Sequence, residues 1–286
     1  MEQSQLDRRA YQLAKDYLPS LKIHGVTAEL IETYLKPTPA NCESITKNEL
    51  YRRLLESAQN ANMKSGVIGK AIGGFNKLSS VLCDFNPGEV LEKYKDWGSV
   101  LDQVKEQLKP RGKMRSESQS IWPKYCRTIL SAASFVEQFK SADDFLGWVD
   151  FFDKDERSRA SLPMLIDKEI DGLGFALACD FLKELGYVKF PKPDIHLRDI
   201  FTALKLCDSK ADNYQLFKAI VRLANNAKVS PYEADKVFWL IGSGNFYNHP
   251  NIGKKGKIGS NKKAFIKDAQ LKLYNMDTPK KSVKFV

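Results

Sequence analysis

The chain has 286 residues, of which 43% are hydrophobic, and it carries a formal net charge of +10. This length is enough to bury a core in one large domain or in two smaller ones. No apolar run approaches the roughly 18 residues of a membrane span, and the charged N-terminus lacks the pattern of a secretory signal, so we expect a soluble cytoplasmic protein.

The predicted elements are helices from one end of the chain to the other. Apolar residues recur at spacings of three and four, the period of an α-helix, and alternating runs typical of strands are scarce. The ranges with this period are 49–62, 88–108, 125–139, 143–152, 174–185, 213–227 and 232–243. Proline- and glycine-rich breaks separate them at 36–42, 85–88, 109–118, 187–193 and after 242. The predicted fold class is therefore all-α.

The five cysteines are scattered along the chain and odd in number. They are Cys42, Cys83, Cys126, Cys179 and Cys207. Their spacing forms neither a zinc pattern nor a four-cysteine iron–sulfur pattern. We expect reduced thiols, mostly buried, and no iron–sulfur cluster.

Most of the net charge lies at the end of the chain. Residues 251–286 contain ten lysines and two aspartates, a net charge of +8, so the preceding 250 residues carry only +2. A segment of this kind attracts polyanions by releasing their counterions. The alternative is a solvated tail that only aids solubility.

The most informative segment is 165–201. It predicts a helix, a tight turn at Asp171-Gly172-Leu173-Gly174, a second helix, a proline-rich loop and a further helix. Glycine permits a positive φ in such a turn and lets the backbone approach a phosphate without a Cβ in the way. The second helix then begins with N–H groups and a positive dipole end facing that phosphate. We expect Leu173 to pack between the two helices.

An acidic residue follows this hairpin at a fixed distance. Asp194 lies 22 residues after Gly172 and opens the stretch Asp194-Ile195-His196-Leu197. The segment resembles the helix-hairpin-helix (HhH-GPD) DNA glycosylase superfamily, in particular the endonuclease III and 8-oxoguanine glycosylase group. The residues that match its G-x-G turn, its small residue four positions later and its D-x-H stretch are Gly172, Gly174, Ala178, Asp194 and His196. The resemblance covers residues 165–201 and is faint elsewhere.

The resemblance implies that Asp194 is the catalytic carboxylate. In this family the aligned aspartate stabilises the positively charged sugar as the bond between C1′ and the base breaks, and it directs water to C1′. The structural alternative is that Asp194 caps the helix beginning near Ile195, which is compatible with catalysis. His196 is expected to support the Asp194 loop through a hydrogen bond.

Ala176 distinguishes this chain from the bifunctional members of the family. Those members carry a lysine two positions after the second glycine, whose amine forms a Schiff base with C1′ and leads to strand cleavage. Ala176 at that position implies a monofunctional enzyme that uses water. Two alternatives remain: a glycosylase/lyase that takes its lysine from elsewhere, such as Lys168, and a non-catalytic DNA-binding module.

Further contacts with DNA are predicted on the same basis. The candidates for binding the DNA backbone are Gly172, Leu173, Gly174, Ala176, Arg198, Lys254 and Lys255. The candidates for the base pocket, or for the wedge that fills the place of a flipped base, are Gln59, Asn60, Asn62, Trp122, Tyr125 and Phe175. The alternatives are a plain helix C-terminus for the polar group and core packing for the aromatic group.

The family also implies an architecture of two helical lobes that flank a DNA-binding cleft. Residues 46–189 would form a helical barrel ending in the hairpin, and residues 1–45 with 190–250 would form the lobe that carries Asp194. Residues 251–286 would be a basic extension. The implied partner is double-stranded DNA with a damaged or modified base, bound by a nucleoid-associated monomer. No cofactor is expected beyond a monovalent cation at the hairpin, and no motif identifies the base.

Overall fold

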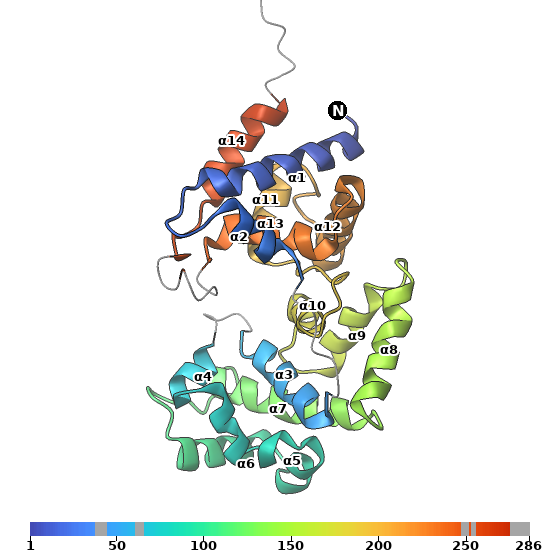
Figure 1. Cartoon of the computed structure of the whole chain (residues 1–286). Helices are drawn as coiled ribbons and strands as arrows, with labels where there is room; N and C mark the ends of the chain where they lie inside the picture. Colours follow the sequence, from blue (N-terminus) through green and yellow to red (C-terminus); the bar gives the residue numbers. More distant parts are fainter. Residues whose placement is uncertain (38–44, 61–65, 247–251, 253–255, 275–286) are drawn as a thin grey trace, which may run out of the picture. The chain divides into compact units, whose positions relative to one another are not determined.

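The computed structural model describes residues 1–37, 45–60, 66–246, 252 and 256–274 (Figure 1). These residues form helices, and their extended pairing is a single bridge between Asn245 and Lys257. The predicted all-α class is confirmed. No helix in this part of the chain combines the length and the apolar character that a bilayer crossing requires.

The chain divides into two compact units, and each has a core of its own. The N/C unit combines Met1–Thr38 with Val188–Val286, and the central unit is Pro39–Tyr187. Both ends of the chain therefore belong to one unit, and the other unit is built from one continuous stretch.

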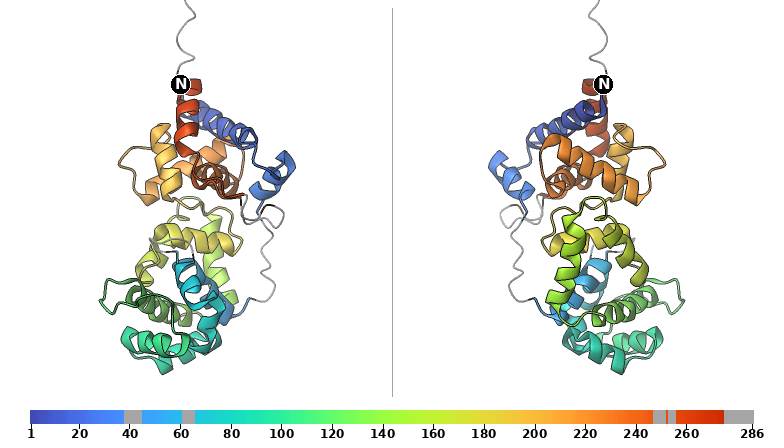
Figure 2. Two further views of the ribbon diagram at one scale, coloured as in Figure 1. Left: turned by 90° about the vertical axis from the view of Figure 1, so that its left-hand side faces the viewer. Right: turned by 90° about the vertical axis from the view of Figure 1, so that its right-hand side faces the viewer.

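The N/C unit is a group of six helices in its described residues. They are α1 (Gln3–Ser20), α2 (Ala28–Leu35), α11 (Ile195–Ala203), α12 (Asn213–Ala227), α13 (Pro231–Ser243) and α14 (Lys262–Tyr274). Helix α1 contacts α12, α13 and α14, and the two terminal helices α1 and α14 lie side by side (Figures 1 and 2). Aromatic side chains fill the centre, with the rings of Phe201 and Phe265 both packed edge-on against Phe238.

An ion pair with a buried carboxylate joins the N-terminal helix α1 to α12 in this unit. Asp7 on α1 is fully buried, and its carboxylate accepts hydrogen bonds from Arg222 at 2.9 Å and from Asn226 at 2.7 Å, both on α12. Gln3 donates a further bond to Asp7 at 2.9 Å. A buried carboxylate needs such partners because desolvation strongly disfavours an unpaired charge. The pair therefore holds α1 against α12.

The central unit is arranged around one long helix, α7 (Ile121–Glu137), which contacts α3, α5, α6 and α9. The other elements are α3 (Lys47–Ala58), α4 (Val67–Ile72), η1 (Phe75–Ser80), η2 (Cys83–Phe85), α5 (Pro87–Lys93), α6 (Trp97–Gln103), the π-helical turn η3 (Val104–Leu108), α8 (Ala142–Lys154), α9 (Ser161–Glu169) and α10 (Phe175–Glu184). Tyr51 and Tyr125 tie α3 to α7, because their hydroxyls donate to the carbonyls of Ile129 and Leu55 at 2.8 and 2.9 Å.

The single helix predicted over 88–108 is wrong. The chain breaks at Tyr94, whose backbone is extended, and it restarts as α6 at Trp97. The side chain of Asp96 accepts the backbone N–H of Ser99 at 2.8 Å and so caps the new helix. Apolar spacing continues across this break, which is why periodicity alone does not reveal it.

The lysine-rich end of the chain is not a solvated tail over residues 262–274. This segment forms α14, which buries Phe265, Ala269 and Leu273 against the rest of the N/C unit. Lys262 at its start forms an ion pair with Asp199 of α11. Its apolar positions, spaced by four, provide the buried stripe despite the high lysine content.

Candidate functional site

The segment predicted to form the hairpin folds in the central unit as α9 and α10, two helices that contact each other and are joined by residues 170–174. Gly172 has a φ of +80°, in the left-handed region that favours glycine. Leu173 is fully buried, as expected for the residue between the two helices. Gly174 is the N-cap residue of α10 and is exposed, like Gly172. The turn therefore presents backbone at its surface and anchors itself through one side chain.

Two hydroxyl groups of α7 hold this turn in place. Thr128 donates a hydrogen bond to the carbonyl of Asp171 at 2.6 Å, and the N–H of Asp171 donates to Ser131 at 3.0 Å. A Cβ added to Gly172 would lie 2.9 Å from the Thr128 hydroxyl. Glycine is therefore required at 172 both by its φ and by this neighbour. Thr128 and Ser131 are two of several polar residues on α7, and no sequence signal singles them out.

Gly174, unlike Gly172, could be replaced by another residue without backbone strain or a steric clash. Its φ of −64° and ψ of 164° are open to any residue, and an added Cβ would meet nothing within 4 Å. Neither its φ nor packing inside the unit requires a glycine here, although glycine is among the residues that helices favour at the N-cap. A ligand that approaches the start of α10 from outside would explain it.

Asp194 lies in the N/C unit, at the end of the proline-rich loop and at the N-cap of α11. Its Oδ1 accepts the N–H of His196 at 2.8 Å and the N–H of Leu197 at 3.1 Å. Within the described residues no hydrogen bond engages the other oxygen, Oδ2. One oxygen thus holds the carboxylate rigidly to the helix, and the second remains available to a ligand or to water.

A second carboxylate, that of Asp235, is hydrogen-bonded to this loop. Asp235 on α13 is buried, and its Oδ2 accepts the N–H of Lys192 at 2.9 Å, two residues before Asp194. Burial raises the pKa of the Asp194 carboxyl above its ordinary value, and the negative charge of Asp235 raises it further. The bond from Leu197 and the charges of His196 and Lys192 act in the opposite direction. Asp235 is a component of the site that sequence reasoning did not identify.

Helix α13 also fixes the position of His196. A Cβ added to Gly242 would lie 2.5 Å from the Cβ of His196, so the two helices touch at this glycine. The ring Nδ1 of His196 is buried and has no hydrogen-bond partner among the described residues. We expected the His196 side chain to support the Asp194 loop by a hydrogen bond, but its Nδ1 makes none in the described residues. His196 instead donates its backbone N–H to Asp194.

Arg198, a predicted phosphate contact, is engaged within the N/C unit. Its guanidinium donates to the carbonyl of Ala211 and, at 2.7 Å, to the side chain of Asn213. These bonds fasten α11 to the start of α12. Contact between Arg198 and a phosphate stays a prediction. Lys254 and Lys255, the other predicted cations, lie outside the described residues.

The polar candidates for a wedge instead bind the backbone beside α4. The side-chain oxygen of Gln59 accepts the N–H of Gly69 at 3.1 Å, and that of Asn60 accepts the N–H of Gly66 at 3.0 Å. Gln59 is also buried, and its place in the wedge stays a prediction. The structure thus gives both residues a local role, and Asn62 lies outside the described residues.

The aromatic candidates lie in the core of the central unit. Trp122 and Tyr125 pack edge to face with ring centroids 6.4 Å apart, and both are buried. Phe175 is buried as well, and Ala176 beside it is half-buried. Their place in a base pocket stays a prediction.

The structure thus groups the predicted residues in two places. Gly172, Leu173 and Gly174 share the turn between α9 and α10 in the central unit. Asp194 and Lys192 share a loop of the N/C unit, to which Asp235 of α13 is hydrogen-bonded. Among the described residues, no cluster of three or more histidine, cysteine, aspartate or glutamate side chains is placed to hold a metal ion. No family model, curated protein or solved structure matches the chain.

Proposed function

We propose that this protein is a DNA glycosylase that hydrolyses the bond between a damaged or modified base and its sugar, with Asp194 as the catalytic carboxylate. The observation that carries the proposal is the geometry of Asp194. Its Oδ1 is bound to two backbone N–H groups, and its Oδ2 is left without a hydrogen bond in the described residues. A carboxylate held in this way has one oxygen free for chemistry.

The reaction assigns that oxygen two tasks. As the bond from C1′ to the base breaks, positive charge develops on the sugar, and a nearby carboxylate stabilises it. A water molecule then attacks C1′ and gives its proton to the carboxylate, which acts as a general base. The departing base keeps the bonding electrons and takes up a proton from solvent. The raised pKa of Asp194 makes its carboxylate a stronger base than an ordinary aspartate.

The hairpin supports the DNA part of the proposal. Gly172 and Gly174 expose backbone at the start of α10, where N–H groups and the helix dipole favour a phosphate. The absence of any internal requirement for glycine at 174 fits an external backbone approaching this turn. Ala176 supports hydrolysis by water, because it offers no amine for a covalent intermediate.

The variant Asp194→Asn tests the assignment. Asparagine is as good an N-cap as aspartate, so the helix keeps its cap while the general base is lost. We expect base release to fall at least about a hundredfold, with DNA binding retained. The substrate is found first by mass spectrometry of bases released from a panel of DNAs carrying oxidised purines, alkylated bases, mismatched thymine or uracil, and modified pyrimidines.

Asp212→Asn is the matched control. Asp212 caps α12 in the same unit and accepts the N–H of Gln215 at 2.8 Å. It is the same substitution at the same kind of position, so base release should be unchanged. Equal rates for Asp194→Asn and wild type would remove Asp194 from catalysis. DNA binding without any released base would favour a non-catalytic binding module.

Borohydride trapping distinguishes the water-directed route from the lyase route. A Schiff base between a lysine and C1′ is reduced to a stable adduct, whereas hydrolysis by water leaves nothing to trap. We expect no covalent adduct with substrate DNA. An adduct that disappears in Lys168→Gln would instead assign a glycosylase/lyase.

A further inference from the structure

A basic loop of the central unit lies outside the proposed site. Residues 109–120 connect η3 to α7. Every second residue from 109 to 115 is basic, and the loop contains one acidic residue, Glu117. The side chains of Lys109, Arg111, Lys113 and Arg115 are exposed, whereas Met114 is half-buried. The loop thus turns its charges outward and its apolar residue inward.

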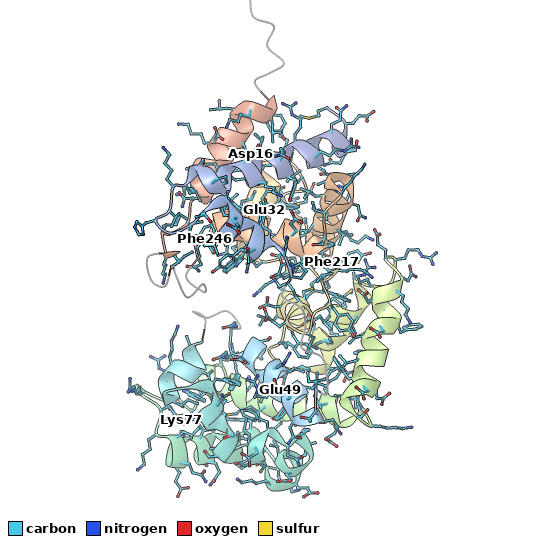
Figure 3. All side chains as sticks on the ribbon, in the orientation of Figure 1. Asp16, Glu32, Glu49, Lys77, Phe217 and Phe246 are labelled. Atoms are coloured by element: carbon cyan, nitrogen blue, oxygen red, sulfur yellow. The ribbon has the colours of Figure 1, made fainter. Side chains whose placement is uncertain are left out.

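The loop is fastened to a segment without acidic residues. The N–H of Arg111 donates to the carbonyl of Ala71 in α4 at 2.7 Å. Residues 57–83, which include α4 and η1, contain no aspartate or glutamate. Lys77 of η1, labelled in Figure 3, is exposed, and η1 contacts η3 at the root of the loop. We call Lys77, Lys109, Arg111, Lys113 and Arg115 the basic surface.

No member of the basic surface forms an ion pair in the described residues, although the charge of Arg115 contributes to lowering the pKa of the Glu117 carboxyl in the same loop. Elsewhere in the central unit cations meet carboxylates: Lys47 lies 2.8 Å from Glu137, and Arg53 lies 2.7 Å from Glu49. In the part of the chain that the structure describes, no carboxylate lies within ion-pair distance of any member of the basic surface. Their charges are available to an anion from outside.

The backbone at the start of the loop is in a rare conformation. Lys109 has a φ of +45° and a ψ of +59°, a left-handed conformation that side-chain residues adopt infrequently. It directly follows the π-helical turn Val104–Leu108, and π-helical turns are frequent at functional sites. Backbone of this kind persists when the surrounding structure enforces it. The direction of the loop is therefore set by η3, which precedes it, and by the hydrogen bond from Arg111 to Ala71.

We propose that the basic surface binds the phosphate backbone of duplex DNA, as a contact additional to the hairpin. The proposal rests on the proposed action on DNA. A row of outward cations matches a polymer of regularly spaced phosphates, which is bound through released counterions. Amphipathic membrane-binding segments add apolar side chains that insert beside their cations. No large hydrophobic side chain is exposed between residues 66 and 120.

The test compares two triple variants that lose the same charge. The loop variant is Arg111→Gln, Lys113→Gln and Arg115→Gln; the control variant is Lys95→Gln, Lys140→Gln and Lys154→Gln. The control lysines are exposed residues of the central unit that have no ion pair within the described residues. Binding of a short fluorescent duplex is measured over a series of KCl concentrations. The slope of log K against log[KCl] counts the phosphate contacts, at about 0.9 for each.

We expect the loop variant to lower that slope by about 2 to 3 and to weaken binding roughly a hundredfold near 0.1 M salt. The control variant should keep the slope of wild type. Melting curves show that both variants are folded, and Arg111→Lys with Arg115→Lys should bind as wild type does.

Three results would overturn the inference in distinguishable ways. If the slope of log K against log[KCl] were equal for the loop variant and wild type, the basic surface would have no role in DNA binding. The proposed function would still stand, provided that wild type binds DNA and releases the base. Wild type that fails to bind any duplex would overturn both proposals. Loop-dependent binding to anionic phospholipid vesicles without DNA binding would assign the surface to a membrane and also overturn the inference.

Discussion

At the scale of single residues, our proposal gives the two oxygens of Asp194 different roles. Oδ1 caps α11 through His196 and Leu197, and Oδ2 is the atom to which we assign chemistry. Helix capping and catalysis are thus not competing explanations of the same carboxylate. The cap limits the movement of the side chain, which keeps the free oxygen in one position.

The proposed role of Asp194 predicts how base release depends on pH. Only the carboxylate can accept a proton, so release should fall as the pH drops below the pKa of Asp194, which lies above that of an ordinary aspartate. Asp235→Asn removes a negative neighbour and keeps an oxygen for the Lys192 N–H, so it should move this decline to lower pH. Single-turnover rates across pH measure it, and an unchanged or higher midpoint would contradict the assignment.

The raised pKa of Asp194 also affects the stability of the folded protein. A carboxyl whose pKa is raised in the folded state holds its proton more tightly there than in the unfolded state. Stability is therefore lost as the pH rises through the raised pKa of Asp194, and this loss is complete above it. Asp194→Asn lacks the titrating group, so its melting temperature at neutral pH should equal or exceed that of wild type. The difference between the two should shrink at acidic pH.

The two glycines of the hairpin should respond differently to substitution by alanine. Gly172→Ala forces a side chain into a positive φ and to within 2.9 Å of the Thr128 hydroxyl, and should cost at least about 1 kcal/mol of folding free energy. Gly174→Ala meets no neighbour and should cost at most about 1 kcal/mol, the usual penalty of alanine at an N-cap. Its effect should appear as weaker DNA binding.

Urea unfolding and duplex binding of both hairpin variants separate these effects. Each variant serves as the control for the other, because Gly172→Ala should mainly lower stability and Gly174→Ala should mainly weaken DNA binding. Gly174→Ala with wild-type stability and wild-type DNA affinity would argue against a phosphate at this turn.

At the scale of elements, helical periodicity located most of the helices but not their ends. The period runs unbroken through 88–108, yet the chain breaks at Tyr94 because Asp96 caps a new helix and the Tyr94 hydroxyl donates to the Val81 carbonyl at 2.7 Å. The partner in that second bond lies on a different part of the chain. A break of this kind depends on a tertiary contact that local sequence does not contain.

Helix α14 allows a stability test within one element. Leu273 is buried and Leu271 is 51% exposed, two residues apart on the same helix. Leu273→Ala should lower the free energy of unfolding by about 2 to 4 kcal/mol, and Leu271→Ala by less than about 0.5 kcal/mol. Urea unfolding curves of the full chain measure both. Equal effects would show that α14 does not pack as a part of the N/C unit.

At the scale of the whole molecule, the two units differ in how the chain builds them. Residues 39–187 contain all of the central unit, whereas the N/C unit needs residues from both ends. Helix α1 buries Leu6, Ala10, Tyr11 and Leu18 in that unit, and its Asp7 pairs with Arg222. We expect a fragment of residues 39–187 to be helical and to melt cooperatively.

The matching fragment of residues 188–286 should not melt cooperatively by itself. Without α1, Arg222 and Asn226 lose their buried partner, and the apolar faces of α12 and α13 that pack on α1 are exposed to water. Adding a peptide of residues 1–38 should restore a cooperative transition, followed by circular dichroism. A folded 188–286 fragment would show that α1 is dispensable.

The sequence by itself determined the all-helical class and located the hairpin turn and the cap at Asp194. These features are local: the period of apolar residues, the glycine turn and an aspartate before a helix act through neighbours in the chain. The tertiary structure decided which distant residues form hydrogen bonds with these features. Thr128 and Ser131 brace the turn from 40 or more residues away, and Asp235 reaches the Asp194 loop from α13. Such contacts depend on how helices pack, and helical periodicity specifies which face of a helix is buried without specifying its partner.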